Sequence, residues 1–169
     1  MVLLYPSTLQ NSLLKAIPKP QCDSKSRSKS VKFYQAVNDD DDDHFYTTDK
    51  KELAEILKKS FNDEGTIGRI FKSQEKGSVE LFRLYNKEET DHALASSKQD
   101  RKDLEKKGYK NQKTAGYVYP KLLCGSVPLF ELFNEDKTDH VYTTDEDERD
   151  DLVNDGYDDL GPVGFIYPK

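Results

Sequence analysis

The chain has 169 residues, a formal net charge of −6, and equal fractions of hydrophobic and charged residues, 34% each. Its 10 tyrosines and 8 phenylalanines are too many for a disordered chain and predict a small, ordered domain with an aromatic core. The acidic balance argues against duplex DNA or an anionic membrane surface as the main partner, and no stretch is apolar enough to span a bilayer.

The first 30 residues differ from the rest of the chain in charge, with five basic residues and one acidic residue. Residues 2–6 resemble residues 117–120 and 165–168, which suggests an additional closing strand. Residues 25–30, KSRSKS, have the composition of a flexible basic linker. No basic residue precedes the apolar beginning of the chain, which prolines interrupt, so it is a poor signal peptide. We therefore predict an extension and linker over residues 1–30 and a cytoplasmic protein, with an extracellular location open if a signal has been removed.

The remaining chain contains an internal repeat. The three histidines of the chain, His44, His92 and His140, lie 48 residues apart, and each directly follows an aspartate. A fixed period of this size is typical of repeat folds. The period predicts one domain over residues 31–169, built from three repeats over 31–78, 79–126 and 127–169.

Each repeat reads as strand, strand, short helix, strand. The first strand ends at an asparagine that favours a turn (Asn38, Asn86 or Asn134), and the Asp-His pair then begins the second strand. Hydroxyl residues followed by acids, such as Thr47 and Thr48, predict the start of a helix. The first helix has an apolar face of Leu53, Ile56, Leu57 and Phe61. Gly108-Tyr109 and Gly156-Tyr157 are typical of helix ends, and the last strand follows a glycine that all three repeats share, Gly68, Gly116 or Gly164.

One such unit cannot bury its apolar face alone, so three copies are expected to pack together. The predicted fold class is α+β and β-rich, with the repeats closed around a pseudo-threefold axis in a three-bladed, propeller-like arrangement. A β-trefoil has the same symmetry, but its repeat is usually all strand; a linear solenoid is the third choice.

The repeats resemble an uncharacterised family found in bacteria and fungi. Its pattern appears here as Phe82-Arg83-Leu84-Tyr85-Asn86, as residues 43–48 (DHFYTT), and as Gly108-Tyr109 followed by residues 116–119 (GYVY). The resemblance covers residues 31–169. It implies carbohydrate or cell-wall binding, because in that family the repeats accompany secreted hydrolases or stand alone. Two repeats depart from the pattern: the second has ALAS at residues 93–96, and the first has Ser60-Phe61 in place of Gly-Tyr.

The Asp-His pairs are the candidate binding constellation. Aspartate, histidine and tyrosine side chains can hydrogen-bond sugar hydroxyls while an aromatic ring packs on the face of the sugar. The predicted ligand-binding residues are Asp43, His44, Tyr46, Asp91, His92, Asp139, His140 and Tyr142, with the Asp91-His92 site weaker or degenerate. The alternative interpretation is that each histidine bonds a neighbouring strand or turn and only stabilises the fold.

Metal binding is the less favoured hypothesis. Three histidines that pointed to the axis could hold zinc, and the five aspartates of residues 39–43 could attract calcium. The histidines are instead expected at three peripheral sites, and the aspartates in a solvated turn. We predict no metal and no cofactor. Cys22 and Cys124 could form one disulfide, which is too few for a framework.

Catalysis has little support, because the sequence has no nucleophile elbow, phosphate-binding loop or metalloprotease helix. We therefore predict a non-catalytic, lectin-like protein whose partners are glycans or cell-wall polysaccharide, with several weak sites gaining avidity. One alternative is a structural, storage or defence protein without a small ligand. The other is a protein-binding or inhibitor module that uses residues 127–169, which carry thirteen acidic and three basic residues.

Overall fold

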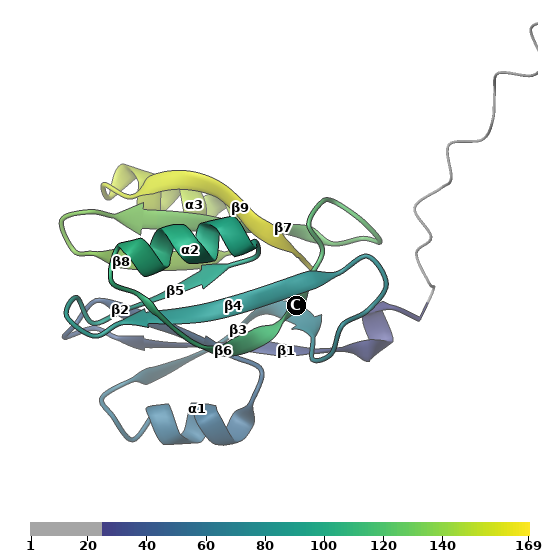
Figure 1. Cartoon of the computed structure of the whole chain (residues 1–169), viewed down its shortest axis with the longest axis horizontal. Coiled ribbons are helices and arrows are strands. Elements are labelled where there is room, and N and C mark those ends of the chain that lie inside the picture. The colour runs from purple at the N-terminus through teal and green to yellow at the C-terminus, as the bar shows by residue number, and fades with distance from the viewer. Residues whose placement is uncertain (1–24) are drawn as a thin grey trace, which may run out of the picture.

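The computed structural model describes residues 25–169 (Figure 1). A 3₁₀ turn, η1 (Arg27–Lys29), precedes the first strand. The elements are β1 (Ser30–Asn38), β2 (Asp43–Thr47), α1 (Lys50–Ile56), β3 (Asn62–Phe71), β4 (Val79–Asn86), β5 (Asp91–Ala95), α2 (Lys98–Lys106), β6 (Lys110–Val118), β7 (Val127–Asn134), β8 (Asp139–Thr143), α3 (Glu146–Asn154) and β9 (Asp158–Ile166). The order strand, strand, helix, strand thus occurs three times, as predicted for each repeat.

The strands form two antiparallel sheets, and the predicted β-rich α+β class is confirmed. The larger sheet has the order β2-β1-β3-β6-β4-β5, and the smaller has the order β8-β7-β9. Within each repeat the first strand lies between the other two. The first two repeats share one sheet because Phe71 of β3 pairs with Tyr117 of β6. Two isolated bridges join the other repeats, Tyr119 to Phe165 and Arg69 to Tyr167.

The turn after each first strand is shaped by its asparagine, as predicted. The Asn38 side-chain oxygen accepts a hydrogen bond from the Asp40 N–H, and Asn134 accepts one from the Lys137 N–H. Asn86 also accepts from the backbone of its turn. Side chains that bond the backbone two or three residues ahead favour such turns.

The helices begin one residue later than the hydroxyl pattern suggests. Asp49, Ser97 and Asp145 are the N-caps, and each accepts a hydrogen bond from a backbone N–H of the first turn. The Thr47 hydroxyl instead accepts from the Asp49 N–H and donates to the Glu52 carboxylate. Helix α1 ends at Ile56, so Phe61 of the predicted apolar face lies beyond it.

The Gly-Tyr steps end helices α2 and α3, as predicted. Gly108 and Gly156 have φ values of 97° and 93°, and the N–H groups of Tyr109 and Tyr157 bond back to carbonyl groups of the last turn. The first repeat has Ser60 at this place with a φ of 66°, a left-handed conformation that is costly for a residue with a Cβ.

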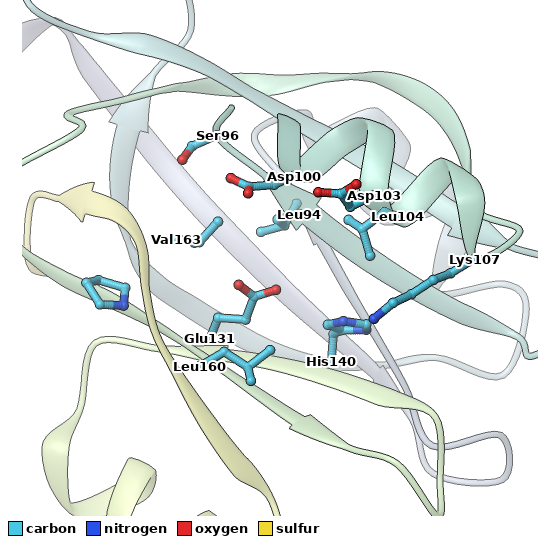
Figure 2. A pocket seen from close by; sticks show the side chains of 11 residues that line it. Leu94, Ser96, Asp100, Asp103, Leu104, Lys107, Glu131, His140, Leu160 and Val163 are labelled. Carbon is cyan, nitrogen blue, oxygen red and sulfur yellow. The ribbon is translucent and has the colours of Figure 1, made fainter. Parts of the chain in front are cut away.

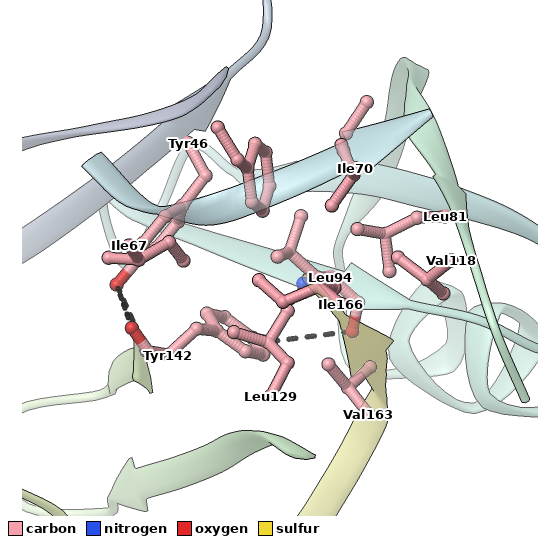
Figure 3. Close-up of a cluster of buried hydrophobic side chains, with 12 residues drawn as sticks. Tyr46, Ile67, Ile70, Leu81, Leu94, Val118, Leu129, Tyr142, Val163 and Ile166 are labelled. Atoms are coloured by element: carbon pink, nitrogen blue, oxygen red, sulfur yellow. Dashed lines mark hydrogen bonds between the residues drawn. The ribbon is translucent and has the colours of Figure 1, made fainter. Parts of the chain in front are cut away.

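The central core draws on all three repeats. Figure 3 shows the cluster, and its buried members fall into four sets of three residues spaced 48 apart. The sets are Phe33, Leu81 and Leu129; Tyr46, Leu94 and Tyr142; Ile67, Ala115 and Val163; and Ile70, Val118 and Ile166. Each repeat therefore supplies the same four positions to one shared core.

A second cluster closes the end of the core at which the third strands finish. Phe71, Tyr119 and Tyr167 are buried and meet edge to face, with ring centroids 5.3 to 6.1 Å apart. Nearby, Gly116 lies so close to the first repeat that a Cβ would be 2.7 Å from the Phe71 carbonyl oxygen. The shared glycines are therefore needed where the third strands pack together.

Residues 25–30, predicted as a flexible linker, contact the C-terminal residues through Arg27. The Arg27 guanidinium donates to the carbonyl oxygen of Pro168 at 3.1 Å and lies 5.7 Å from the Tyr167 ring centroid. The suggested strand at residues 2–6 lies outside the described residues. Cys124 is disulfide-bonded, and Cys22 also lies outside the described part of the chain. Within residues 25–169, no helix is long and apolar enough to cross a membrane.

Candidate functional site: the clefts between repeats

Each histidine bonds an aspartate of the preceding repeat. Nδ1 of His92 lies 2.9 Å from both carboxylate oxygens of Asp43, and Nδ1 of His140 lies 2.6 Å from Asp91. Nδ1 of His44 lies 2.9 Å from Asp139, which joins the first repeat to the third. Because a carboxylate only accepts hydrogen bonds, each Nδ1 carries the proton and donates it.

The aspartates accept more hydrogen bonds than these. Asp43 and Asp91 also accept from the backbone N–H of His92 and His140, both at 3.0 Å. The Tyr109 hydroxyl donates to Asp91 at 2.5 Å. The Tyr157 hydroxyl donates to Asp139 at 2.6 Å in the same way, whereas the first repeat has Phe61 at this position. The three aspartates are at most 1% exposed, and these buried carboxylates are matched by the histidine bonds across the repeat boundaries and, for Asp91 and Asp139, by a tyrosine of the same repeat.

Two of the predicted binding residues, Tyr46 and Tyr142, lie fully buried in the central core. The Tyr46 hydroxyl accepts from the Tyr142 N–H at 2.9 Å, and the Tyr142 hydroxyl accepts from the Leu94 N–H at 2.8 Å and donates to Glu131 at 2.9 Å. Burial raises the pKa of both phenols well above the usual value, so they stay protonated. Their hydroxyls connect repeats within the protein rather than facing solvent.

One pocket, which we call the His92 pocket, opens at the boundary between the first and second repeats. It has a volume of about 270 Å³. Its lining consists of Asn38, Asp41, Asp43, Ile56, Lys59, Phe61, Tyr85, Thr90, His92 and Gln112. The Tyr85 ring packs against the imidazole of His92 with centroids 4.3 Å apart. The structure therefore brings the predicted residues Asp43 and His92 together with Tyr85 and Phe61, which had not been predicted as site residues.

A second pocket, which we call the Glu131 pocket, opens at the boundary between the second and third repeats (Figure 2). It has a volume of about 340 Å³. Its lining consists of Leu94, Ser96, Asp100, Asp103, Leu104, Lys107, Glu131, His140, Leu160, Pro162 and Val163. Figure 2 shows the Lys107 side chain extending toward His140 at one end, with the Glu131 carboxylate pointing into the cavity. His140 is thus the predicted site residue that reaches this pocket.

No metal centre is formed by the part of the chain that the structure describes: residues 25–169 contain no group of three or more histidine, cysteine, aspartate or glutamate side chains placed to hold an ion. The three imidazoles each face a different aspartate. The residues that line the two pockets offer hydrogen-bonding groups, aromatic rings and charged groups.

Residues 32–167 match a family described as a domain of unknown function, DUF5648. The chain belongs to the DUF5648 family. No curated protein and no solved structure matches it. The match spans all three repeats, so the DUF5648 domain contains the whole Asp-His network and both pockets.

Sequence reasoning missed the residues that make the three repeat boundaries within this DUF5648 domain differ from one another. Gln35, Arg83 and Glu131 are 48 residues apart and carry different charges, so a search for shared residues passes over them. Arg83 is 3% exposed and bonds Glu52 across the first boundary at 2.7 Å. The available signal was the change of charge at one position of an otherwise regular repeat.

Proposed function

We propose that this protein is a non-catalytic, lectin-like carbohydrate-binding protein whose sites are the clefts between three repeats closed around a pseudo-threefold axis. The His92 pocket is the observation that carries the binding proposal. Its partners would be glycans or cell-wall polysaccharide. The Asp-His pairs would hold the pockets in shape while the edges of His92 and His140 face the ligand.

The closed, propeller-like arrangement is supported by contacts that run in one direction around the three repeats. Each histidine bonds the aspartate of the preceding repeat, and the first repeat bonds the third. The three strand bridges, Phe71 to Tyr117, Tyr119 to Phe165 and Tyr167 to Arg69, occupy positions related by the same period. The helix in every repeat favours this arrangement over a β-trefoil.

The His92 pocket has the mixture of groups that sugars require. Tyr85 and Phe61 are partly exposed and offer aromatic faces, on which the apolar face of a pyranose ring can pack. Thr90 and Gln112 offer neutral donors and acceptors for hydroxyl groups. Small-molecule sites commonly combine an apolar wall with a few oriented polar groups in this way.

The test is a glycan-array screen with the purified protein and the variant Tyr85→Ala. The control is Tyr117→Ala, which removes a partly buried ring beside the cluster of Phe71, Tyr119 and Tyr167, at the opposite end of the paired strands β4 and β6 from Tyr85. We expect selective binding that Tyr85→Ala weakens by about two- to tenfold and that Tyr117→Ala leaves unchanged, because a contact with one aromatic ring contributes about 0.5–1.5 kcal/mol.

A blank array with folded protein would contradict the carbohydrate proposal and favour a structural or protein-binding role. Binding that both variants reduce equally would place the site elsewhere. Circular dichroism of each variant separates these outcomes from unfolding.

A further inference from the structure

At the first repeat boundary an arginine and a glutamate form an ion pair, and the residues at the same positions of the other two boundaries line pockets. Arg83 of β4 lies against Glu52 of α1, with its guanidinium 2.7 and 3.1 Å from the two carboxylate oxygens. The same guanidinium donates to the Tyr46 carbonyl oxygen at 2.9 Å and lies 4.2 Å from the Phe45 ring centroid. Gln112 accepts a further bond from it at 2.8 Å. The protein thus contains one complete guanidinium site, occupied by its own arginine.

At the second boundary the equivalent guanidinium is missing while the acid remains. The residues that replace Arg83, Phe45 and Gln112 are Glu131, Ala93 and Leu160, and Asp100 replaces Glu52. A shorter side chain and the loss of one aromatic ring leave space, and the Glu131 pocket of about 340 Å³ opens here. The cavity therefore occupies the place that corresponds to the filled guanidinium site.

The lining of this cavity is more acidic than the filled site. The Glu131 carboxylate accepts one hydrogen bond at Oε1 from the Tyr142 hydroxyl, and within residues 25–169 no hydrogen bond reaches its Oε2. Asp100 lines the same cavity, and its carboxylate accepts a hydrogen bond from the hydroxyl of its own helix cap, Ser97. Lys107 is the cation among the lining residues, and Figure 2 shows it at the His140 end. Burial raises the pKa of Glu131, so its negative charge is costly without a partner.

We propose that the Glu131 pocket binds a guanidinium group between Asp100 and Glu131, in the way that Glu52 holds Arg83 at the preceding boundary. The ligand would be a small guanidinium compound or an arginine side chain of a peptide. A planar guanidinium matches paired carboxylate oxygens better than a compact ammonium ion does, which favours arginine-like over lysine-like ligands. This proposal rests on Asp100 and Glu131 and does not depend on the carbohydrate proposal, which the His92 pocket carries.

The third boundary supplies a natural comparison. There Gln35 takes the place of Glu131, opposite Glu148 of α3. The amide is neutral, and the carboxylate that this pocket receives from the first repeat is Glu64, at the position of Gln112, with Lys169 lining the same pocket. The second boundary is therefore the one with a carboxylate at the position of the arginine itself, and one guanidinium ligand is expected there.

The first test is calorimetric titration of the protein with agmatine, with an arginine-containing tripeptide and with butylamine as the ammonium control. We expect agmatine to bind with a stoichiometry of one and butylamine to bind more weakly. Glu131→Gln and Asp100→Asn should each reduce agmatine affinity by about tenfold or more, because each removes one charge-assisted contact. Asp147→Asn, which removes an exposed acid of α3, should change nothing.

The comparison of agmatine with the tripeptide shows whether the guanidinium belongs to a small molecule or to a peptide side chain. Binding of agmatine without the tripeptide indicates a small-molecule ligand, and binding of both indicates a peptide side chain. No heat with agmatine at millimolar concentration, or affinity that Glu131→Gln leaves unchanged, would overturn the proposal.

A second test uses the equivalence of the two boundaries. Glu131→Arg should place a guanidinium opposite Asp100, raise the melting temperature and abolish agmatine binding. Conversely, Arg83→Ala should lower the melting temperature, and propylguanidinium should restore part of the loss in that variant more than in the wild type. If Glu131→Arg destabilises the protein and still binds agmatine, the two boundaries are not equivalent and the inference is wrong.

Discussion

Asp91 holds His140 by two hydrogen bonds across the boundary between the second and third repeats, one from the backbone N–H at 3.0 Å and one from Nδ1 at 2.6 Å. Neither bond is available within a single repeat. The two side chains of an Asp-His pair therefore do not bond each other. The aspartate accepts from the histidine of the following repeat, and the histidine donates to the aspartate of the preceding one.

The first prediction concerns that aspartate. Asp91→Ala leaves the His140 imidazole, its backbone N–H and the Tyr109 hydroxyl without their acceptor in a buried site. We expect a loss of about 3–5 kcal/mol in the free energy of unfolding, measured by urea denaturation. Asp158→Ala, at an exposed position, should lose less than about 0.5 kcal/mol. Equal, small losses in both variants would contradict the structural role of the pair.

The second prediction restores a contact that the first repeat lacks. Phe61 occupies the position at which Tyr109 and Tyr157 donate to a buried aspartate, so Phe61→Tyr should provide the missing donor for Asp43. We expect a gain of about 1 kcal/mol in the free energy of unfolding, and Tyr109→Phe should lose about 1.5–3 kcal/mol.

The third prediction concerns the residue before Phe61. Ser60 has a φ of 66° where the other repeats have glycine, so Ser60→Gly should remove a left-handed strain worth about 1 kcal/mol. Thermal denaturation measures the gain, and combining the change with Phe61→Tyr shows whether the two gains add. A lower melting temperature for Ser60→Gly would show that the serine makes a contact that offsets its strain.

Much of this fold follows from sequence, because the features that define each repeat are local. A turn asparagine such as Asn134 bonds the next few residues, and a Gly-Tyr step such as Gly156-Tyr157 ends the helix before it. The 48-residue period then places these features three times. Local hydrogen bonding and periodicity therefore predicted the elements and their order.

The sites were less predictable, because they are made between repeats. The period does not say whether Asp91 meets His92 beside it or His140 in the next repeat, and only the packing decides this. Nor does it say that Tyr46 points into the core, since an aromatic residue beside a polar turn fits a surface site equally well. The contrast of Arg83 and Glu131 matters only once both are known to face a helix of the preceding repeat.

The fourth prediction compares two glutamates, Glu52 and Glu131, whose pKa values are shifted in opposite directions in the folded protein. Burial alone would raise the pKa of Glu52, but hydrogen bonds from Arg83 and Thr47 outweigh it and lower the pKa to about 2. Its contribution to stability is therefore present above the unfolded-state pKa of about 4.5 and is lost as the pH falls toward 2. Glu52→Gln should lower the melting temperature at pH 7, with the difference shrinking below pH 4.5.

Replacing Glu131 by glutamine should change the melting temperature in the opposite direction. Burial raises its pKa in the folded protein, so folding favours the protonated form, and the charged form costs stability as the pH rises through that raised value. Glu131→Gln should raise the melting temperature at pH 7, and the advantage should vanish near pH 3.5, where the wild-type carboxyl is protonated in both states. The glutamine oxygen can still accept from Tyr142, so the comparison isolates the charge.

The fifth prediction tests the close approach of the third strands. A Cβ at Gly116 would lie 2.7 Å from the Phe71 carbonyl oxygen and 2.5 Å from Cδ1 of Ile70, so Gly116→Ala must push the first and second repeats apart. We expect a loss of at least about 1–3 kcal/mol in the free energy of unfolding. Gly65→Ala is the matched control, because its Cβ would meet nothing within 4 Å and only its φ of 82° opposes the change, at about 1 kcal/mol. A Gly116→Ala variant that keeps the stability of the wild type, and so loses less than Gly65→Ala, would mean that the repeats can separate at this strand without cost, and the close approach of the third strands would then not be what stabilises the domain.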